Sequence, residues 1–154
     1  MRVSLICVGA LGRAPEALIA LDYARRASAV GRALRIGPVE IIEVEARKPG
    51  RRGEADAILA KAAGGLLIAC DEHGGARTSR QFADRLASLR GEGVPRVSFA
   101  IGGADGLDPA VLDAAAERFS FGPLTWPHAL ARTMLAEQVY RALTILTGGP
   151  YHRD

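Results

Sequence analysis

The sequence holds little cysteine, and the two thiols that it has lie in apolar segments. Cys7 and Cys70 are the two cysteines among 154 residues. Two thiols cannot build a disulfide framework, so we expect both to be reduced core residues of a cytosolic protein. No cysteine or histidine spacing matches a metal site, and we expect no bound metal.

Long apolar runs are also missing. No stretch reaches the length that a bilayer-spanning helix needs. Residues 1–9 lack the basic flank, the apolar length and the cleavage site of a signal peptide. We therefore expect a cytoplasmic protein without a membrane partner, folded as one domain over residues 1–154, because the chain shows no repeat or linker.

Aromatic residues make up only 5% of the chain, whereas 49% of the residues are hydrophobic and 24% are charged. This composition is typical of a globular chain with a real core rather than a disordered one. The net charge of +3 is mild evidence for a polyanionic partner and does not establish one.

Short apolar runs and helical patterns alternate along the chain. Strands are predicted at residues 3–8, 39–44, 66–70 and 97–101. Helices are predicted from Pro15, over residues 54–63, after Thr78 or Ser79, from Asp108–Pro109 and over residues 128–147. The alternation predicts an α/β fold, a mostly parallel sheet flanked by helices.

Three segments between these elements carry polar or glycine-rich sequence. Residues 47–53 are basic, contain no apolar side chain and predict a loop that could contact phosphates. Residues 71–75 predict a polar turn. Residues 102–107 (Gly-Gly-Ala-Asp-Gly-Leu) follow a buried strand, and a glycine turn there lets backbone N–H groups approach a ligand. The spacing is neither a dinucleotide fingerprint nor a P-loop.

The last helical segment is apolar on one face and polar where that face begins. Its apolar stripe is continued toward the helix start by His128 and Arg132, which an ordinary core face would not carry. The opposite face holds apolar side chains beside Glu137 and Arg141, an i,i+4 pair. A helix that is apolar on two sides predicts a second partner, for which another subunit is the simplest choice. The stripe itself comprises Leu135, Val139, Leu143 and Leu146.

Taken together, these motifs resemble those of one family over essentially the whole chain. The residues that carry the resemblance are 101–107, 125–132 (Thr-Trp-Pro-His-Ala-Leu-Ala-Arg), 137–142 (Glu-Gln-Val-Tyr-Arg-Ala) and 150–153 (Pro-Tyr-His-Arg). They are similar to those of the ribosomal RNA large subunit methyltransferase H (RlmH) family, minimal enzymes of the SPOUT class. The resemblance implies a SPOUT-type fold with a C-terminal trefoil knot, a homodimer and S-adenosylmethionine as cofactor. It also implies methylation at N3 of a pseudouridine in 23S ribosomal RNA, on the assembled ribosome.

The resemblance also assigns residues. The implied cofactor site comprises Cys70, Gly103, Gly122, Pro123, Leu124, Thr125, Trp126 and Pro127. The implied substrate and catalytic positions are His128, Arg132, Glu137, Arg141, Tyr151, His152 and Arg153. Cys70 replaces a leucine common in the family, and Gly122–Pro123 replaces a serine-containing segment, so backbone contacts are expected at both places.

The chemistry of this reaction suggests roles for some of these residues. Methylation of a pseudouridine at N3 requires loss of the N3 proton and stabilisation of the resulting anion. We hypothesise that Arg132 or Arg153 stabilises the anion, and that His152 or Glu137 takes the proton. His128 would position the base or the loop before the last helix.

Three other interpretations of the sequence stay open. A small nucleotide-dependent oxidoreductase would bind a nicotinamide or flavin cofactor, although the dinucleotide fingerprint is missing. A non-enzymatic RNA-binding factor would bind RNA without regard to S-adenosylmethionine, but it would not need successive glycine turns at strand ends. A purely structural role would leave His128 and Arg132 unexplained.

Overall fold

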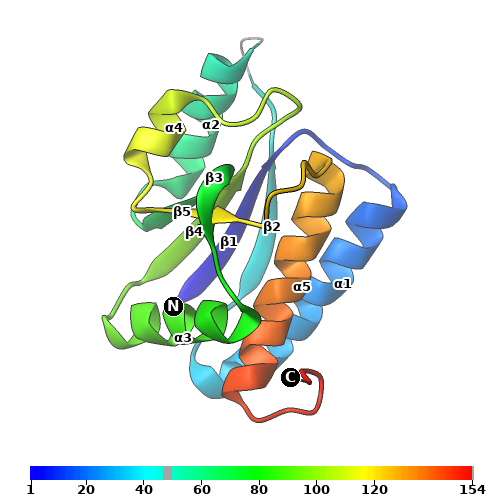
Figure 1. Ribbon diagram of the computed structural model, residues 1–154, viewed down its shortest axis with the longest axis vertical. Coiled ribbons are helices and arrows are strands. Elements are labelled where there is room, and N and C mark those ends of the chain that lie inside the picture. The colour runs from blue at the N-terminus through cyan, green and yellow to red at the C-terminus, as the bar shows by residue number, and fades with distance from the viewer. Residues whose placement is uncertain (47–49, 154) are drawn as a thin grey trace.

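In the computed structural model, which describes residues 1–46 and 50–153, five strands form one sheet in the order β2-β1-β4-β3-β5 (Figure 1). The strands are β1 (Arg2–Val8), β2 (Val39–Val44), β3 (Leu66–Ala76), β4 (Arg96–Ile101) and β5 (Glu117–Ser120). All four strand pairings are parallel, which confirms the predicted fold class. The trefoil knot stays a prediction.

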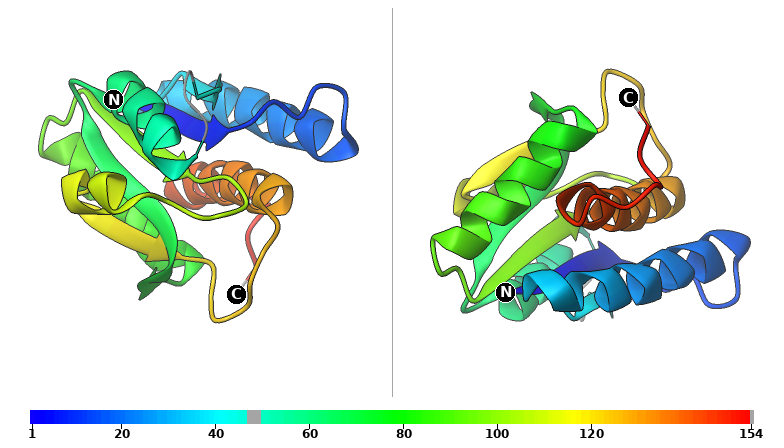
Figure 2. Two further views of the ribbon diagram at one scale, coloured as in Figure 1. Left: turned by 90° about the horizontal axis from the view of Figure 1, so that it is seen from above. Right: turned by 90° about the horizontal axis from the view of Figure 1, so that it is seen from below.

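Helices cover both faces of this sheet (Figure 2). One face carries α1 (Pro15–Gly31), α3 (Ser79–Gly91) and α5 (His128–Leu146), and the other carries α2 (Arg51–Ala62) and α4 (Pro109–Ala114). A short 3-10 helix, η1 (Arg32–Leu34), follows α1. Side chains of β1 alternate between the two cores, with Leu5 and Cys7 toward α1 and α5, and Ile6 and Val8 toward α2.

The apolar stripes of the helices explain this packing. Ala20, Ala24 and Ala27 form the buried stripe of α1, and their small size lets α1 lie beside α5. Leu135, Val139 and Leu143 of the predicted stripe on α5 are all fully buried. The expected start of α3 is also confirmed, since Thr78 caps it in a capping box with Gln81. No helix in residues 1–46 and 50–153 is long and apolar enough to cross a membrane.

Two predictions about loops are wrong. Residues 71–75 do not form a turn but continue β3, because after a register shift Gly75 and Ala76 pair with Phe119 and Ser120 of β5. Backbone pairing with this edge strand overrides the local turn propensity. The predicted basic loop is shorter than expected, because α2 already begins at Arg51. Residues 47–49 of that loop lie outside the described residues.

Chain connectivity places one loop over the edge of the sheet where the strands end. β5 is an edge strand beside β3. The helix α5 packs against α1 and so lies beyond β4 as counted from β5. Residues 121–127 therefore cross the carboxyl ends of β3 and β4 before α5 begins (Figure 1). Ligands of open α/β sheets bind outside these strand ends, so this crossing loop builds the wall of a site.

Candidate functional site

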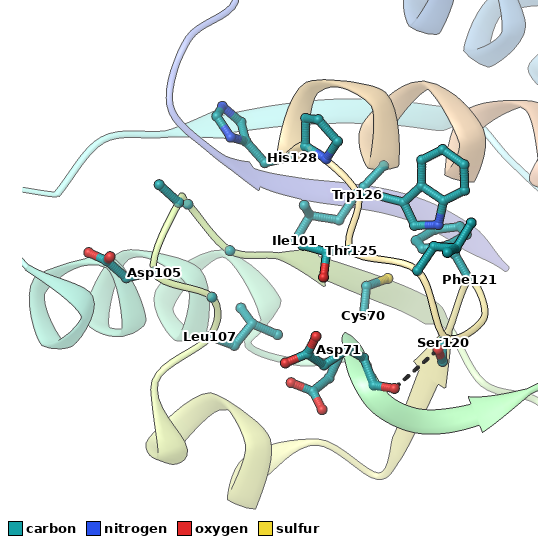
Figure 3. A pocket seen from close by; sticks show the side chains of 18 of the residues that line it. Cys70, Asp71, Ile101, Asp105, Leu107, Ser120, Phe121, Thr125, Trp126 and His128 are labelled. Carbon is teal, nitrogen blue, oxygen red and sulfur yellow. Dashed lines mark hydrogen bonds between the residues drawn. The ribbon is translucent and has the colours of Figure 1, made fainter.

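A cavity of about 640 Å³ opens at the carboxyl edge of the sheet (Figure 3). Three chain segments line it: residues 70–72 at the bend of β3, residues 101–107 after β4, and residues 120–127 between β5 and α5, although Pro123 is not among them. His128 and Ala131 of the first turns of α5 complete the lining. The volume lies in the range of sites for small molecules and cofactors.

The glycine turn after β4 is closely packed. A Cβ atom on Gly102 would lie 2.6 Å from the carbonyl carbon of Gly106, which no side chain tolerates. A Cβ atom on Gly103 would lie 3.3 Å from both carboxylate oxygens of Glu54 and from Val8. Gly106 has a φ of +74° and donates its N–H to the carbonyl of Gly103. The turn therefore exposes backbone rather than side chains to the cavity.

Among the described residues, the charged side chains that line the cavity are all acidic. Asp71, Glu72 and Asp105 contribute three carboxylates, and no lysine or arginine of residues 1–46 and 50–153 lines the cavity. Arg51 reaches the edge of this lining, where its guanidinium lies 3.5 Å from the carbonyl oxygen of Asp105. Such a lining suits a ligand with positive charge and disfavours the pyrophosphate of a dinucleotide, which is negatively charged.

Seven of the eight residues expected to hold a cofactor line this one cavity, and Pro123 does not. The structure thus brings together segments from residue 70, residue 103 and residues 122–127, which are far apart in sequence. Burial raises the pKa of the Cys70 thiol, so the thiol is uncharged where it forms part of the cavity wall. The role of these seven residues in binding a cofactor stays a prediction.

Sequence analysis missed one residue that shapes the crossing loop. The hydroxyl of Ser120 accepts the N–H of Gly122 at 3.1 Å and lies 3.3 Å from the carbonyl oxygen of Glu72 (Figure 3). It joins the start of the loop to the bend of β3. A serine at a strand end, two residues before Gly122–Pro123, was the signal available, because serine commonly bonds to the backbone two residues on.

Arg132 does not face the cavity. Its side chain is 2% exposed; Nη1 donates to Glu43 Oε1 at 2.5 Å. Nη2 donates to the carbonyl oxygens of Val8 and Gly9, at 3.3 and 2.8 Å. The arginine that interrupts the apolar stripe therefore ties α5 to the ends of β1 and β2. This geometry supplies a structural reason for a side chain that the sequence suggested for catalysis.

The remaining predicted catalytic residues gather at the other end of α5. Glu137 accepts hydrogen bonds from Arg141 Nε at 2.9 Å and from the Tyr151 hydroxyl at 3.0 Å. The guanidinium of Arg141 lies over the ring of Tyr151, 4.8 Å from its centroid. Nη1 of Arg141 lies 3.4 Å from Nδ1 of His152, which must be the acceptor because arginine only donates. Arg153 follows in the tail and is exposed.

Two tyrosines that the sequence analysis did not single out hold this tail in place. The hydroxyl of Tyr23 lies 3.2 Å from that of Tyr151, and the rings of Tyr140 and Tyr151 meet edge to face at 4.7 Å. Burial and the hydrogen bonds to Tyr23 and Glu137 raise the pKa of Tyr151, so its hydroxyl stays protonated and donates. We call residues Tyr23, Glu137, Tyr140, Arg141, Tyr151 and His152 the tail cluster.

The tail cluster and the cavity are separate within one chain. His128 lines the cavity, whereas Arg141 lies thirteen positions farther along α5, a separation of about 20 Å at the rise of an α-helix. The predicted catalytic residues thus fall into three groups: His128 at the cavity, Arg132 in the core, and the others at or beyond the tail cluster. No group of three or more metal-ligating side chains occurs in the described part of the chain.

The sequence matches one family profile along nearly its full length. Residues 1–152 match the family described as "Predicted SPOUT methyltransferase". The ribosomal RNA large subunit methyltransferase H of Caulobacter vibrioides is 62% identical over 154 residues, covering 100% of this chain and 99% of that protein. The protein of the same name from Phenylobacterium zucineum is 56% identical over 154 residues and covers 100% of both chains.

Solved structures share the fold at low sequence identity. A probable methylase family protein from Haemophilus influenzae superposes with a TM-score of 0.61 at 11% identity, covering 99% of this chain and 70% of that one. A probable methyltransferase from Bordetella pertussis gives a TM-score of 0.56 at 18% identity, covering 92% of this chain and 96% of that one. These similarities concern the fold alone.

Proposed function

Because this chain belongs to the SPOUT methyltransferase family, we propose that it transfers a methyl group from S-adenosylmethionine to N3 of a pseudouridine in 23S ribosomal RNA. The assembled ribosome is the substrate in this proposal, and the enzyme accordingly acts in the cytoplasm. The observation that carries the proposal is the cavity at the strand ends, where three segments expose backbone and three carboxylates to one space.

The cavity fits the proposed methyl donor in size and in charge. S-adenosylmethionine has a permanent positive charge, and the part of the lining that the structure describes contains Asp71, Glu72 and Asp105 but no lysine or arginine. The residues that would hold it are Cys70, Gly103 and the loop from Gly122 to Pro127, largely through backbone groups. When bound, it supplies a methyl group already activated on a sulfonium centre.

The chain's own residues must place the base and manage the proton at N3. His128 and Trp126 lie at the cavity and offer an imidazole and an indole ring against which a base can stack. His152 is the proposed general base, and its Nδ1 must first give up the contact with Arg141 Nη1, 3.4 Å away, before it can take the proton from N3. Arg153 would stabilise the imide anion that remains after the proton is lost.

The separation of the tail cluster from the cavity leads to the proposed quaternary structure. Two sites at opposite ends of α5 cannot meet within one chain. In a homodimer the tail of one subunit can complete the cavity of the other. Exposed apolar side chains on α1 and α5, Ile19 at 48% and Leu130 at 40% exposure, provide surface for a partner.

The rival functions predict different ligands for the same cavity. An oxidoreductase would need to seat a pyrophosphate among three carboxylates, which the charges oppose. An RNA-binding factor without catalytic activity would not need a cavity of the size that small molecules occupy. The cavity therefore favours the methyltransferase over both.

Isothermal titration calorimetry with S-adenosylmethionine, S-adenosylhomocysteine and NADH tests the proposed function. We expect saturable binding of both adenosyl compounds at one site per subunit, and no heat of binding with NADH. Because the lining is acidic, the cationic compound should bind at least as tightly as the neutral one. Binding of NADH alone, or of none of the three, would overturn the proposal.

A further inference from the structure

A basic surface lies at the edge of the sheet opposite the cavity. Arg2 begins β1 and Arg96 begins β4, so both lie at the amino-terminal edge of the sheet. A shallow depression of about 660 Å³ at this edge is lined by Met1, Arg35 and Arg90 together with small or apolar residues. We call Arg2, Arg35, Arg90 and Arg96 the arginine end.

The charges of the arginine end are not balanced by acidic side chains. No carboxylate lines the depression, and none of its four arginines forms an ion pair with any residue of the described ranges. Arg90 donates to the carbonyl oxygen of Leu34, and Arg96 donates to that of Ala63. The nearby carboxylate of Glu92 is already bonded to Arg85 and Ser88.

Several arginines elsewhere in the described part of the chain are paired with carboxylates. Arg25 and Arg26 on α1 share Asp22, and Arg77 and Arg85 share Glu117. The arginine end differs from these pairs because it gathers four guanidinium groups without a carboxylate partner among the described residues, which leaves their charge to an external anion. Guanidinium groups suit phosphate well, because their planar fork can donate two parallel hydrogen bonds.

Three arginines of the arginine end occupy backbone positions that are energetically unfavourable for arginine. Arg2 and Arg96 are direct partners on adjacent strands, where like charges repel each other. Arg35 has a φ of +53° and is the one non-glycine residue with positive φ among the described residues. Glycine would relax this left-handed conformation, so an arginine here costs stability that a ligand contact can offset.

We propose that the arginine end binds the phosphate backbone of structured RNA as a second contact, apart from the cavity. The proposal rests on the proposed function, which supplies a ribosomal RNA substrate. β1 has seven residues, so its two ends lie about 20 Å apart. A contact at this distance fixes the orientation of the subunit on folded RNA without reading its sequence, as phosphate contacts do in general.

Fluorescence anisotropy with a labelled RNA duplex of arbitrary sequence, and pelleting with 70S ribosomes, tests the proposal across a salt series. The double variant Arg35→Gln/Arg90→Gln should bind the duplex and the ribosome about tenfold more weakly. The slope of log affinity against log salt, which is negative, should become less steep by about two. The matched variant Arg25→Gln/Arg26→Gln also removes two positive charges and should bind nearly as the wild type. Equal losses in both variants, or no loss in the first, would overturn the proposal.

A single substitution separates RNA contact from folding. Arg35→Gly removes a cation and relaxes the left-handed backbone, so we expect a higher melting temperature together with weaker RNA binding. A higher melting temperature with unchanged RNA affinity would show that the side chain contacts no RNA.

Calorimetry keeps this inference distinct from the proposed function. The Arg35→Gln/Arg90→Gln variant should bind S-adenosylmethionine as the wild type does. If the wild type bound no S-adenosylmethionine but its RNA affinity depended on Arg35 and Arg90, the methyltransferase proposal would fail and the arginine end would stand. If methyl donor and ribosome bound normally to both wild type and variant, the arginine end alone would be refuted.

Discussion

Arg132 and Glu43 are 89 residues apart in sequence and form an ion pair with an Nη1–Oε1 distance of 2.5 Å. The same carboxylate oxygen also accepts the N–H of Leu11 at 3.0 Å. One acidic side chain of β2 thus holds both the loop after β1 and the helix that follows the crossing loop. Ala131, which directly precedes Arg132, lines the cavity, so this pair fixes the helix that forms the cavity wall.

Loss of the Arg132 guanidinium should destabilise the fold. Arg132→Met keeps most of the side-chain volume but leaves two backbone carbonyls without their donor, so we expect a loss of about 3 kcal/mol in the free energy of unfolding. Urea unfolding measures it. Arg25→Met, which removes an exposed arginine from a surface ion pair, should change the same quantity by less than about 1 kcal/mol. A fully stable Arg132→Met protein with a large loss of rate would instead return Arg132 to the catalytic residues.

A methyl group at the glycine turn should obstruct the proposed donor. Gly103→Ala places a Cβ atom 3.3 Å from the carboxylate of Glu54, at the cavity lining. Calorimetry should show affinity for S-adenosylhomocysteine lowered about tenfold or more, roughly 1.4 kcal/mol of binding free energy. Gly91→Ala is the control, because a Cβ atom there meets nothing within 4 Å. Unchanged affinity in Gly103→Ala would remove this turn from the binding site.

A composite site across two subunits predicts complementation between inactive variants. Gly103→Ala disables the cavity and His152→Ala disables the tail cluster, so each alone should methylate poorly. If the variants are unfolded and refolded together in equal amounts, half the dimers are mixed, and each contains one intact composite site. Activity should return to about a quarter of the wild-type value. Activity no greater than the sum of the separate variants would show that each site is built from one chain.

Stability should depend on pH through Glu117. Burial raises the pKa of this carboxyl, but the hydrogen bonds from Arg77 and Arg85 outweigh it and leave the pKa below its ordinary value. The charged carboxylate therefore contributes fully to the free energy of unfolding above its unfolded-state pKa. This contribution is lost as the pH falls through the lower folded-state pKa. Denaturant unfolding of Glu117→Gln should show a weaker decrease in stability than the wild type below about pH 4.3. Parallel curves would contradict this assignment.

The strands and helices that follow simple hydrophobic patterns were predictable from the sequence. β2 and α5 begin where the apolar pattern places them, at Val39 and His128. The continuation of β3 through residues 71–75 was not predictable from the sequence, because its polar and glycine-rich residues are typical of a turn. Only the pairing with β5, far along the chain, makes this segment a strand.

The cavity was more predictable than the catalytic residues. Backbone-exposing segments at strand ends meet at one edge of a parallel sheet, so Cys70, Gly103 and Gly122 could be expected together. The role of Arg132 could not be expected, because it donates to the carbonyl oxygens of Val8 and Gly9. A sequence does not reveal which backbone carbonyls need a side-chain donor. The separation of the tail cluster from the cavity likewise depends on the folded length of α5.

Methyl transfer to ribosomes tests the central claim most directly. Wild-type enzyme would be incubated with S-adenosylmethionine labelled in its methyl group and with 70S ribosomes from cells that lack the endogenous modification, and the RNA would be digested and analysed by mass spectrometry. We predict label in 23S ribosomal RNA at N3 of one pseudouridine, strongly reduced with Gly103→Ala. Label elsewhere, or none despite saturable binding of the methyl donor, would contradict the proposed function.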